Sequence, residues 1–234
     1  MFTKVGIVKV TQEAVNDLSH YLQFTRTGAT MKRITHGIPE EYAAAFKNKD
    51  KTQLVELVLE SLKTLDKQGA DFAIIPTHKV FEPSVHKRII EEAPMRSIHM
   101  MDSTAEDCFS RNFRSVCFLG PSQEIDLYES PLRNKEISIV RPCKEDQDFL
   151  EIVCEAAEAS GGVTKNSQEN VREIFSKLKK DNPFDALVIT HSKLKWSLPW
   201  TFTKVCSINP LYSQAIGADE HVKKQLSIMQ EFGF

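Results

Sequence analysis

Two clusters of polar and ionisable residues could do chemistry in this chain, and each cluster follows a short apolar run. The clusters are Thr77, His78 and Lys79 in the first half, and His191, Ser192 and Lys193 in the second. Histidine, with an ordinary pKa of about 6.5, takes up and releases a proton near neutral pH. Lysine is a compact positive charge that can hold an anion. These residue types indicate acid–base chemistry on a small anionic molecule.

The apolar runs in front of the clusters predict buried parallel strands. Ala73–Ile75 and Leu187–Ile189 are each introduced by an aspartate and, before that, by a long amphipathic helix. Open α/β sheets place their ligand sites at the carboxyl ends of such strands. In each half, about the same number of residues separates the first predicted strand from this apolar run. We therefore expect the two halves to be copies of one doubly wound unit, with a site between them.

Strand-like and helix-like segments alternate through both halves. In the first half we expect a helix through Leu54–Leu65, capped by Asp50, and a helix that a capping-box pattern opens at Ser103. The chain from Pro210 onward predicts a terminal helix that packs on the first lobe. The strands expected are Val5–Val10, Lys32–Thr35, Phe72–Pro76, Arg96–Met100, Ser115–Leu119, Ile137–Val140 and Ala186–Ile189. The long helices expected in the second half are Glu145–Ala159 and Gln168–Lys180.

The expected fold class is α/β, with two pseudo-symmetric doubly wound lobes, parallel sheets and an interlobe cleft. Residues 1–100 with 208–234 are predicted to form the N-terminal α/β lobe, and residues 101–207 the C-terminal lobe. A chain of 234 residues with 41% hydrophobic residues is long enough to bury a core in each.

Composition narrows the partners and the compartment. The net charge of -2 gives no support for nucleic-acid binding. No segment approaches the roughly 20 apolar residues that span a bilayer, and the first residues lack a signal-peptide pattern, so we expect no membrane association. The five cysteines are scattered and lack CxxC spacing. That pattern favours a reducing cytoplasm and argues against a disulfide framework or a metal site.

Four stretches of the sequence resemble the cofactor-independent aspartate/glutamate racemases. The first and last lead into the family's two catalytic positions, the second resembles its strand and following helix, and the third resembles its "P…EEDQ" helix start. The stretches are Gly69–Pro76, Pro94–Ala105, Val140–Gln147 and Asp185–Ile189. The resemblance implies two pseudo-symmetric lobes, a cleft site, no cofactor, a small amino-acid or carboxylate substrate, and often a homodimer.

The chain departs from this family at the catalytic positions. In the family, each motif strand ends in a cysteine, and the two thiols face opposite sides of the substrate α-carbon. Thr77 and His191 stand at those positions here. The polar pairs that follow each cysteine are replaced by His78-Lys79 and Ser192-Lys193, and the family's arginine for the side-chain carboxylate aligns with Glu41.

These substitutions still allow proton transfer. Histidine is a better-placed base near neutral pH than a thiol, whereas a threonine hydroxyl donates or relays a proton only when a neighbour activates it. We predict that His191 is a general acid/base, that Thr77 is its hydrogen-bonding counterpart, and that Lys79 or Lys193 holds the substrate anion. His78 and Ser192 are the other predicted substrate-binding residues. Such an unequal pair favours one-sided isomerisation or decarboxylation over balanced racemisation.

Alternative interpretations remain for the same residues. Loss of both cysteines also fits a catalytically degenerate homologue that binds a small molecule or a protein. Polar residues after a strand are often solvated loop residues, and His99 is expected to be structural. Trp196 and Trp200 either cover the cleft or staple a loop. A flavodoxin-like nucleotide binder is disfavoured, because no GxGxxG or P-loop follows the first strand.

Overall fold

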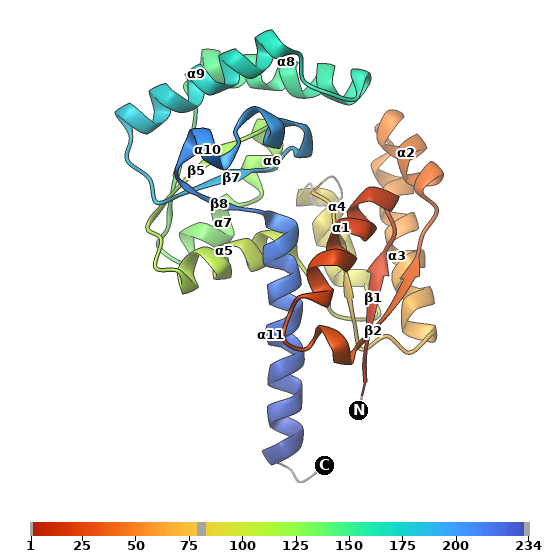
Figure 1. The fold of residues 1–234 in the computed structure, drawn as a ribbon. Helices are drawn as coiled ribbons and strands as arrows, with labels where there is room; N and C mark the ends of the chain where they lie inside the picture. Colours follow the sequence, from red (N-terminus) through yellow and green to blue (C-terminus); the bar gives the residue numbers. More distant parts are fainter. Residues whose placement is uncertain (1, 79–82, 232–234) are drawn as a thin grey trace. The chain divides into compact units, whose positions relative to one another are not determined.

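The computed structural model describes residues 2–78 and 83–231. The chain divides into two compact units, Met1–Ser103 with Leu211–Phe234, and Thr104–Pro210. Within the described residues each unit holds a four-stranded parallel sheet, in the order β2-β1-β3-β4 in the first and β6-β5-β7-β8 in the second. Figure 1 labels β1, β2, β5, β7 and β8 among these strands. The α/β class with two parallel sheets is confirmed, and the repeated strand order supports two copies of one unit.

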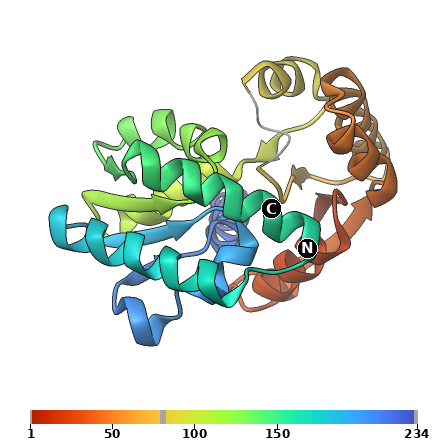
Figure 2. The same ribbon diagram turned by 90° about the horizontal axis from the view of Figure 1, so that it is seen from above.

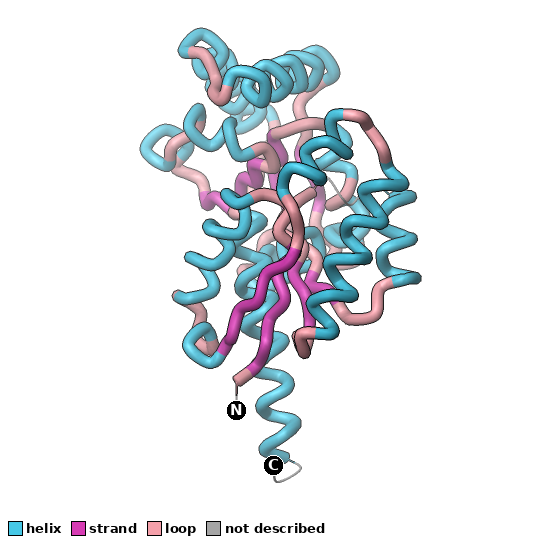
Figure 3. Tube along the Cα trace, turned by 90° about the vertical axis from the view of Figure 1, so that its right-hand side faces the viewer, coloured by secondary structure: helices cyan, strands magenta, loops and turns pink. Residues whose placement is uncertain are grey.

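The first unit alternates strands and helices. Its elements are β1 (Thr3–Val8), α1 (Gln12–Gln23), η1 (Gly28–Thr30), β2 (Met31–His36), α2 (Pro39–Lys47), α3 (Lys51–Lys67), β3 (Phe72–Ile74), α4 (Pro83–Glu92), β4 (Ser97–Ile98) and α11 (Pro210–Glu231). Asp50 caps α3 as expected, because its Oδ1 accepts the backbone N–H of Gln53 at 2.9 Å. Helices cover both faces of the sheet, as Figure 3 shows around the strands of this unit.

The terminal helix α11 packs on the first sheet, as the sequence predicts. Together with α1 it covers the face formed by Val5, Ile7, Phe72 and Ile74, and Ala215, Ala218 and Val222 of α11 are buried there. Asp219 fixes the helix at its side, because its Oδ1 accepts hydrogen bonds from the backbone N–H and hydroxyl of Thr27 at 2.7 and 2.6 Å.

The second unit is built in the same way. Its elements are α5 (Met100–Ser110), β5 (Ser115–Leu119), α6 (Ser122–Asp126), α7 (Glu129–Arg133), β6 (Ser138–Val140), α8 (Lys144–Ser160), α9 (Lys165–Asp181), β7 (Ala186–Ile189), η2 (Ser192–Ser197), α10 (Trp200–Thr203) and β8 (Cys206–Ile208). One expectation is wrong: α5 begins at Met100, so Ser103 lies inside the helix and donates its backbone N–H to the carbonyl of His99.

The faces of the second sheet have separate cores. On one face, α8 and α9 bury Leu150, Val153, Ile174 and Phe175 against strands β5 and β7. Figure 2 shows these two helices side by side above the sheet. On the other face, the Phe118 ring lies 5.0 Å from that of Tyr128. Because β7 is buried along its whole length, it holds the residues at its carboxyl end in a fixed position.

Candidate functional site

The carboxyl end of β7 places Thr190 and His191 at the edge of the second sheet. The backbone N–H of Thr190 donates to the carbonyl of Leu119 at 3.1 Å, which extends the pairing of β7 with β5 by one residue. The carbonyl of His191 then accepts the backbone N–H of Leu194 at 3.1 Å and starts η2. Strand pairing and a tight turn therefore hold the backbone of His191 on both sides.

The imidazole of His191 is buried and has one acidic neighbour. His191 is 5% exposed, and its Nε2 lies 3.2 Å from Oε1 of Glu158, in the last turn of α8. If Nε2 carries the proton and donates it to this carboxylate, Nδ1 is left as an unprotonated base. The arrangement of a histidine oriented by a carboxylate is the one that general acid–base catalysis uses.

Two buried polar atoms at this strand end have no hydrogen-bond partner among the described residues. They are Nδ1 of His191 and Oγ1 of Thr190. Leaving such an atom unpaired in the interior costs about 1–3 kcal/mol. A purely structural histidine normally satisfies both ring nitrogens, so the open nitrogen favours a functional role for His191.

Gly120 lets the two strand ends approach each other. A Cβ at this position would lie 2.0 Å from Oγ1 of Thr190, and Gly120 has φ +154°. Its carbonyl accepts the side-chain N–H of Gln147, on α8, at 2.8 Å. Helix α8 therefore contacts this edge of the sheet through both Gln147 and Glu158.

The matching strand end of the first unit is arranged differently. After β3, the backbone N–H of Thr77 donates to the carbonyl of Ile75 at 3.0 Å, and Thr77 and His78 are both half-buried. Gln214 of α11 donates to the carbonyls of Ile75 and Ile98 at 3.2 and 2.8 Å, which ties the ends of β3 and β4 together. Lys79, the predicted anion holder, lies outside the described residues.

A pair of histidines lies at the end of β4. Nδ1 of His99 is 2.8 Å from Nε2 of His86, on α4, and Nε2 of His99 is 2.8 Å from Oγ of Ser97. Burial, with smaller effects from His86 and Arg96, lowers the pKa of His99 to about 4. His99 is therefore neutral at physiological pH and both of its nitrogens are bonded, which confirms the structural role expected for it.

The remaining predicted residues are exposed or half-buried. Ser192 is exposed and Lys193 is half-buried, and both lie in η2 directly after His191. Glu41, which aligns with the family's arginine, is exposed on α2. The predicted pairing of Thr77 with His191 in one site stays a prediction.

No cysteine takes the place of the missing thiols. Burial raises the pKa of Cys108, Cys117 and Cys154 to about 12, so these thiols stay protonated. Cys143 is exposed and Cys206 is half-buried. Within residues 2–78 and 83–231, no group of three or more His, Cys, Asp or Glu side chains could hold a metal ion.

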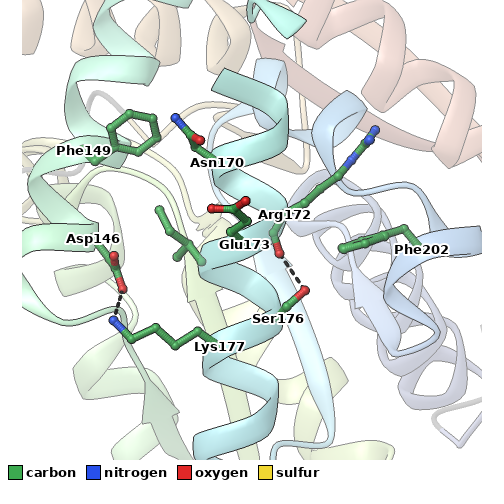
Figure 4. Close-up of a pocket in the computed structure, with 9 residues that line it drawn as sticks. Asp146, Phe149, Asn170, Arg172, Glu173, Ser176, Lys177 and Phe202 are labelled. Carbon is green, nitrogen blue, oxygen red and sulfur yellow. Dashed lines mark hydrogen bonds and ion pairs between the residues drawn. The ribbon is translucent and has the colours of Figure 1, made fainter. Parts of the chain in front are cut away.

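A surface groove of about 650 Å³ lies elsewhere in the second unit, along α8, α9 and α10. Figure 4 shows the Asp146–Lys177 ion pair on one side of α9 and Arg172 beside Phe202 on the other. The ion-pair atoms are 3.0 Å apart. None of the predicted site residues lines this groove, and two of its charged groups, Asp146 and Lys177, pair with each other, so we do not assign the chemistry to it.

Sequence reasoning missed three residues of the His191 environment: Glu158, Thr190 and Gly120. A weak signal for Glu158 was present, because an acidic side chain in the last turn of a helix opposes the helix dipole and gains from a nearby cation. Gly120 follows a predicted strand, where glycine often marks close approach of another group.

Comparisons with known proteins identify the fold. No model of a protein family matches the chain, and no curated protein matches it. Among solved structures, a candidate Asp/Glu racemase from Yersinia pestis is 15% identical with a TM-score of 0.79, covering 94% of this chain and 99% of that one. An aspartate racemase homologue from Pyrococcus horikoshii is 18% identical with a TM-score of 0.71, covering 95% and 100%.

A structure with a lower TM-score was solved with a bound ligand. Glutamate racemase from Francisella tularensis, solved in complex with D-glutamate, is 13% identical with a TM-score of 0.61, and the match covers 98% of this chain and 81% of that one. These identities are too low to transfer an activity, but the coverage is nearly complete. The chain therefore has the fold of the aspartate and glutamate racemases.

Proposed function

We propose that the chain is a member of the aspartate/glutamate racemase family and acts as a cofactor-independent isomerase. Its reaction is proton transfer at the α-carbon of a small carboxylate or amino acid. The observation that carries the proposal is the buried imidazole of His191, paired through Nε2 with Glu158 and with Nδ1 open, at the carboxyl end of a central parallel strand.

In this proposal Nδ1 of His191 removes the α-proton of the substrate. The electron pair of the broken C–H bond moves into the adjacent carboxylate, and the Glu158 carboxylate stabilises the imidazolium that forms. Nδ1 is covered in the structure, so substrate binding must uncover it. Return of the proton from the same imidazole exchanges the hydrogen, and delivery from the opposite face inverts the centre.

The other predicted residues support this step. Thr77 is the hydrogen-bonding counterpart on the other face, and Lys193, with Lys79, holds the substrate anion. His78 and Ser192 complete the binding residues. Because a hydroxyl is a far weaker acid and base than an imidazole, we expect strongly one-sided proton transfer. We further propose a cytoplasmic homodimer without a cofactor.

Solvent deuterium exchange tests the proposal. A panel of amino acids and small carboxylates is incubated with the protein in D₂O, and loss of the α-proton signal is followed by NMR. We expect exchange in at least one compound, lost by about 100-fold or more in His191→Ala, because general acid–base catalysis contributes about 10²–10⁴-fold. No exchange with any compound, or unchanged exchange in His191→Ala, would contradict it.

A second candidate function is binding without turnover. It is favoured by the absence of a thiol at both strand ends, together with the high pKa of the buried cysteines. A thermal-shift screen of the same panel separates the two, because a ligand of the folded state raises the melting temperature whether or not it reacts. Stabilisation by a compound that shows no exchange would favour the binding module.

A further inference from the structure

The segment between β7 and β8 displays aromatic side chains to solvent. It comprises η2, α10 and the residues that join them to β8, and we call Ser192–Lys204 the tryptophan segment. Trp196 is 79% exposed, Trp200 is 64% exposed and Phe202 is 40% exposed. Large aromatic side chains usually bury most of their surface, so three exposed within one short segment indicate a contact surface.

The backbone beneath these rings is firmly held. Leu194 and Leu198 of the segment are buried in the core under α8 and α9. From α9, Nε of Arg172 donates to the carbonyl of Ser197 at 2.8 Å, and Nζ of Lys179 donates to that of Thr203 at 2.9 Å. The backbone that carries the exposed rings is therefore held in place by packing and hydrogen bonds.

The tryptophan segment is also positively charged. It contains Lys193, Lys195 and Lys204, and no Asp or Glu occurs in the sequence between Asp185 and Asp219. Arg172 lies 5.7 Å from the centroid of the Phe202 ring and adds a further cation beside the segment. Acidic groups on the helices packed against it include Glu158, which faces His191, and Glu173, which lines the groove with Phe202.

The positive charge and the exposed aromatic rings together indicate which kind of partner the tryptophan segment binds. A two-fold contact between copies would set the same lysines against one another, which is unfavourable. Tryptophan favours the interface between lipid and water, and lysine is attracted to anionic headgroups. We propose that the tryptophan segment docks the protein on the surface of an anionic lipid bilayer, a role independent of the function proposed above.

Surface docking needs no membrane span, although it differs from the expectation drawn from composition. Among the described residues no helix combines the length and the apolar character that crossing a membrane requires. An interfacial contact needs only a few exposed aromatic side chains and neighbouring cations. The overall charge of -2 hid this surface, because the stretch between Asp185 and Asp219 holds lysines but no acid, whereas the other Lys and Arg residues are outnumbered by the acids around them.

The two tryptophans make the test direct, because they are the only ones in the chain and both lie in the segment. The full-length protein is titrated with vesicles of phosphatidylcholine alone or with phosphatidylserine, and intrinsic fluorescence and co-sedimentation are followed. We expect a blue shift and sedimentation with the anionic vesicles only. Added salt should weaken the binding, since it screens exposed charges.

Variants separate the contributions. Combined Lys195→Gln and Lys204→Gln, which leave the proposed substrate-binding Lys193 in place, should weaken sedimentation by about fivefold per lysine. Combined Trp196→Ser and Trp200→Ser should weaken it by about tenfold or more. Phe24→Ser, which removes an aromatic ring that is 72% exposed in the first unit, is the matched control and should bind as wild type does. Circular dichroism confirms that each variant is folded.

Four results would overturn the proposal. The first is equal or absent sedimentation with both kinds of vesicle. The second is full binding by the tryptophan variant. The third is a change of sedimentation coefficient in analytical ultracentrifugation when the tryptophans are replaced, which would assign the surface to a second copy of the chain. Tighter binding of a single-stranded oligonucleotide than of vesicles would likewise assign it to nucleic acid.

Discussion

The two sheets agree at their amino ends and differ at their carboxyl ends. Asp71, before β3, accepts the backbone N–H of Lys4 at 2.7 Å. Asp185, before β7, does the same for Arg114 and Ser115 at 2.6 and 3.0 Å. In both units an aspartate thus clamps the start of the central strand pair. The aspartate that the sequence repeats before each run therefore has a structural role, because it accepts backbone hydrogen bonds.

The carboxyl ends carry different chemistry on this shared frame. β3 leads to Thr77, next to a strand end where His99 has both nitrogens bonded. β7 leads to His191, whose Nδ1 is open and whose Nε2 faces an acid. Strand order therefore determines where a site can lie. The side chains that follow the strand determine whether the end of β3 or the end of β7 can carry out acid–base catalysis.

The largest effect is expected from crowding the second strand end. Gly120→Ala places a Cβ 2.0 Å from Oγ1 of Thr190 at a backbone φ of +154°. We expect a loss of about 2–4 kcal/mol in the free energy of unfolding, because strain and overpacking combine. Gly162→Ala is the control, since a Cβ there meets nothing within 4 Å. Urea denaturation measures both, and equal stabilities would contradict the close packing at Gly120.

The next effect sharpens the contrast between the two histidine environments. The pKa of His99 is lowered to about 4, so the unfolded chain binds more protons than the folded one between about pH 6.5 and pH 4. Stability from His99 is therefore present above about pH 6.5 and is lost as the pH falls, by about 2–3 kcal/mol. Urea midpoints should fall less steeply over this range in His99→Gln, whereas exposed His20→Gln should follow wild type.

The acid beside His191 is expected to act on rate more than on stability. Glu158→Gln keeps the shape and a hydrogen bond but removes the charge that stabilises an imidazolium, so exchange should slow by about 10–100-fold. Glu155→Gln, exposed on the same helix, should leave the rate unchanged. A Glu158→Gln variant as fast as wild type would show that this carboxylate does not assist His191.

The smallest effect tests the similarity of the two amino ends. Asp71→Ala and Asp185→Ala each leave backbone N–H groups without their acceptor, and each should cost about 1–2 kcal/mol of unfolding free energy. The two losses should agree within about 1 kcal/mol, with Asp185 the larger because it accepts two bonds. Urea denaturation measures both losses. A negligible loss at either position would contradict the claim that the two aspartates stabilise their units in the same way.

The sequence predicts the fold better than the site. Buried apolar runs such as Ala186–Ile189 and the amphipathic stripe of α3 carry a periodic signal, so their strands and helix are confirmed. β8 was missed, because Cys206–Ile208 is only three residues long and pairs as a strand with β7, a contact that the local sequence does not display. Its existence depends on tertiary contacts rather than on local pattern.

The partners of His191 were equally hidden in the sequence. Glu158 is 33 residues away and reaches the imidazole only because α8 packs across the sheet edge. The position of His191 was readable because it ends a buried strand. Its chemistry was not, because the open state of one ring nitrogen is a property of the folded neighbourhood.

The ratio of exchange rates in two variants tests the central claim most directly. That claim is that the second strand end, not the first, carries the proton transfer. With the compound that exchanges fastest in D₂O, His191→Ala should slow α-proton exchange by about 100-fold or more, and Thr77→Ala by less than about 10-fold. Equal losses, or a greater loss in Thr77→Ala, would contradict the account.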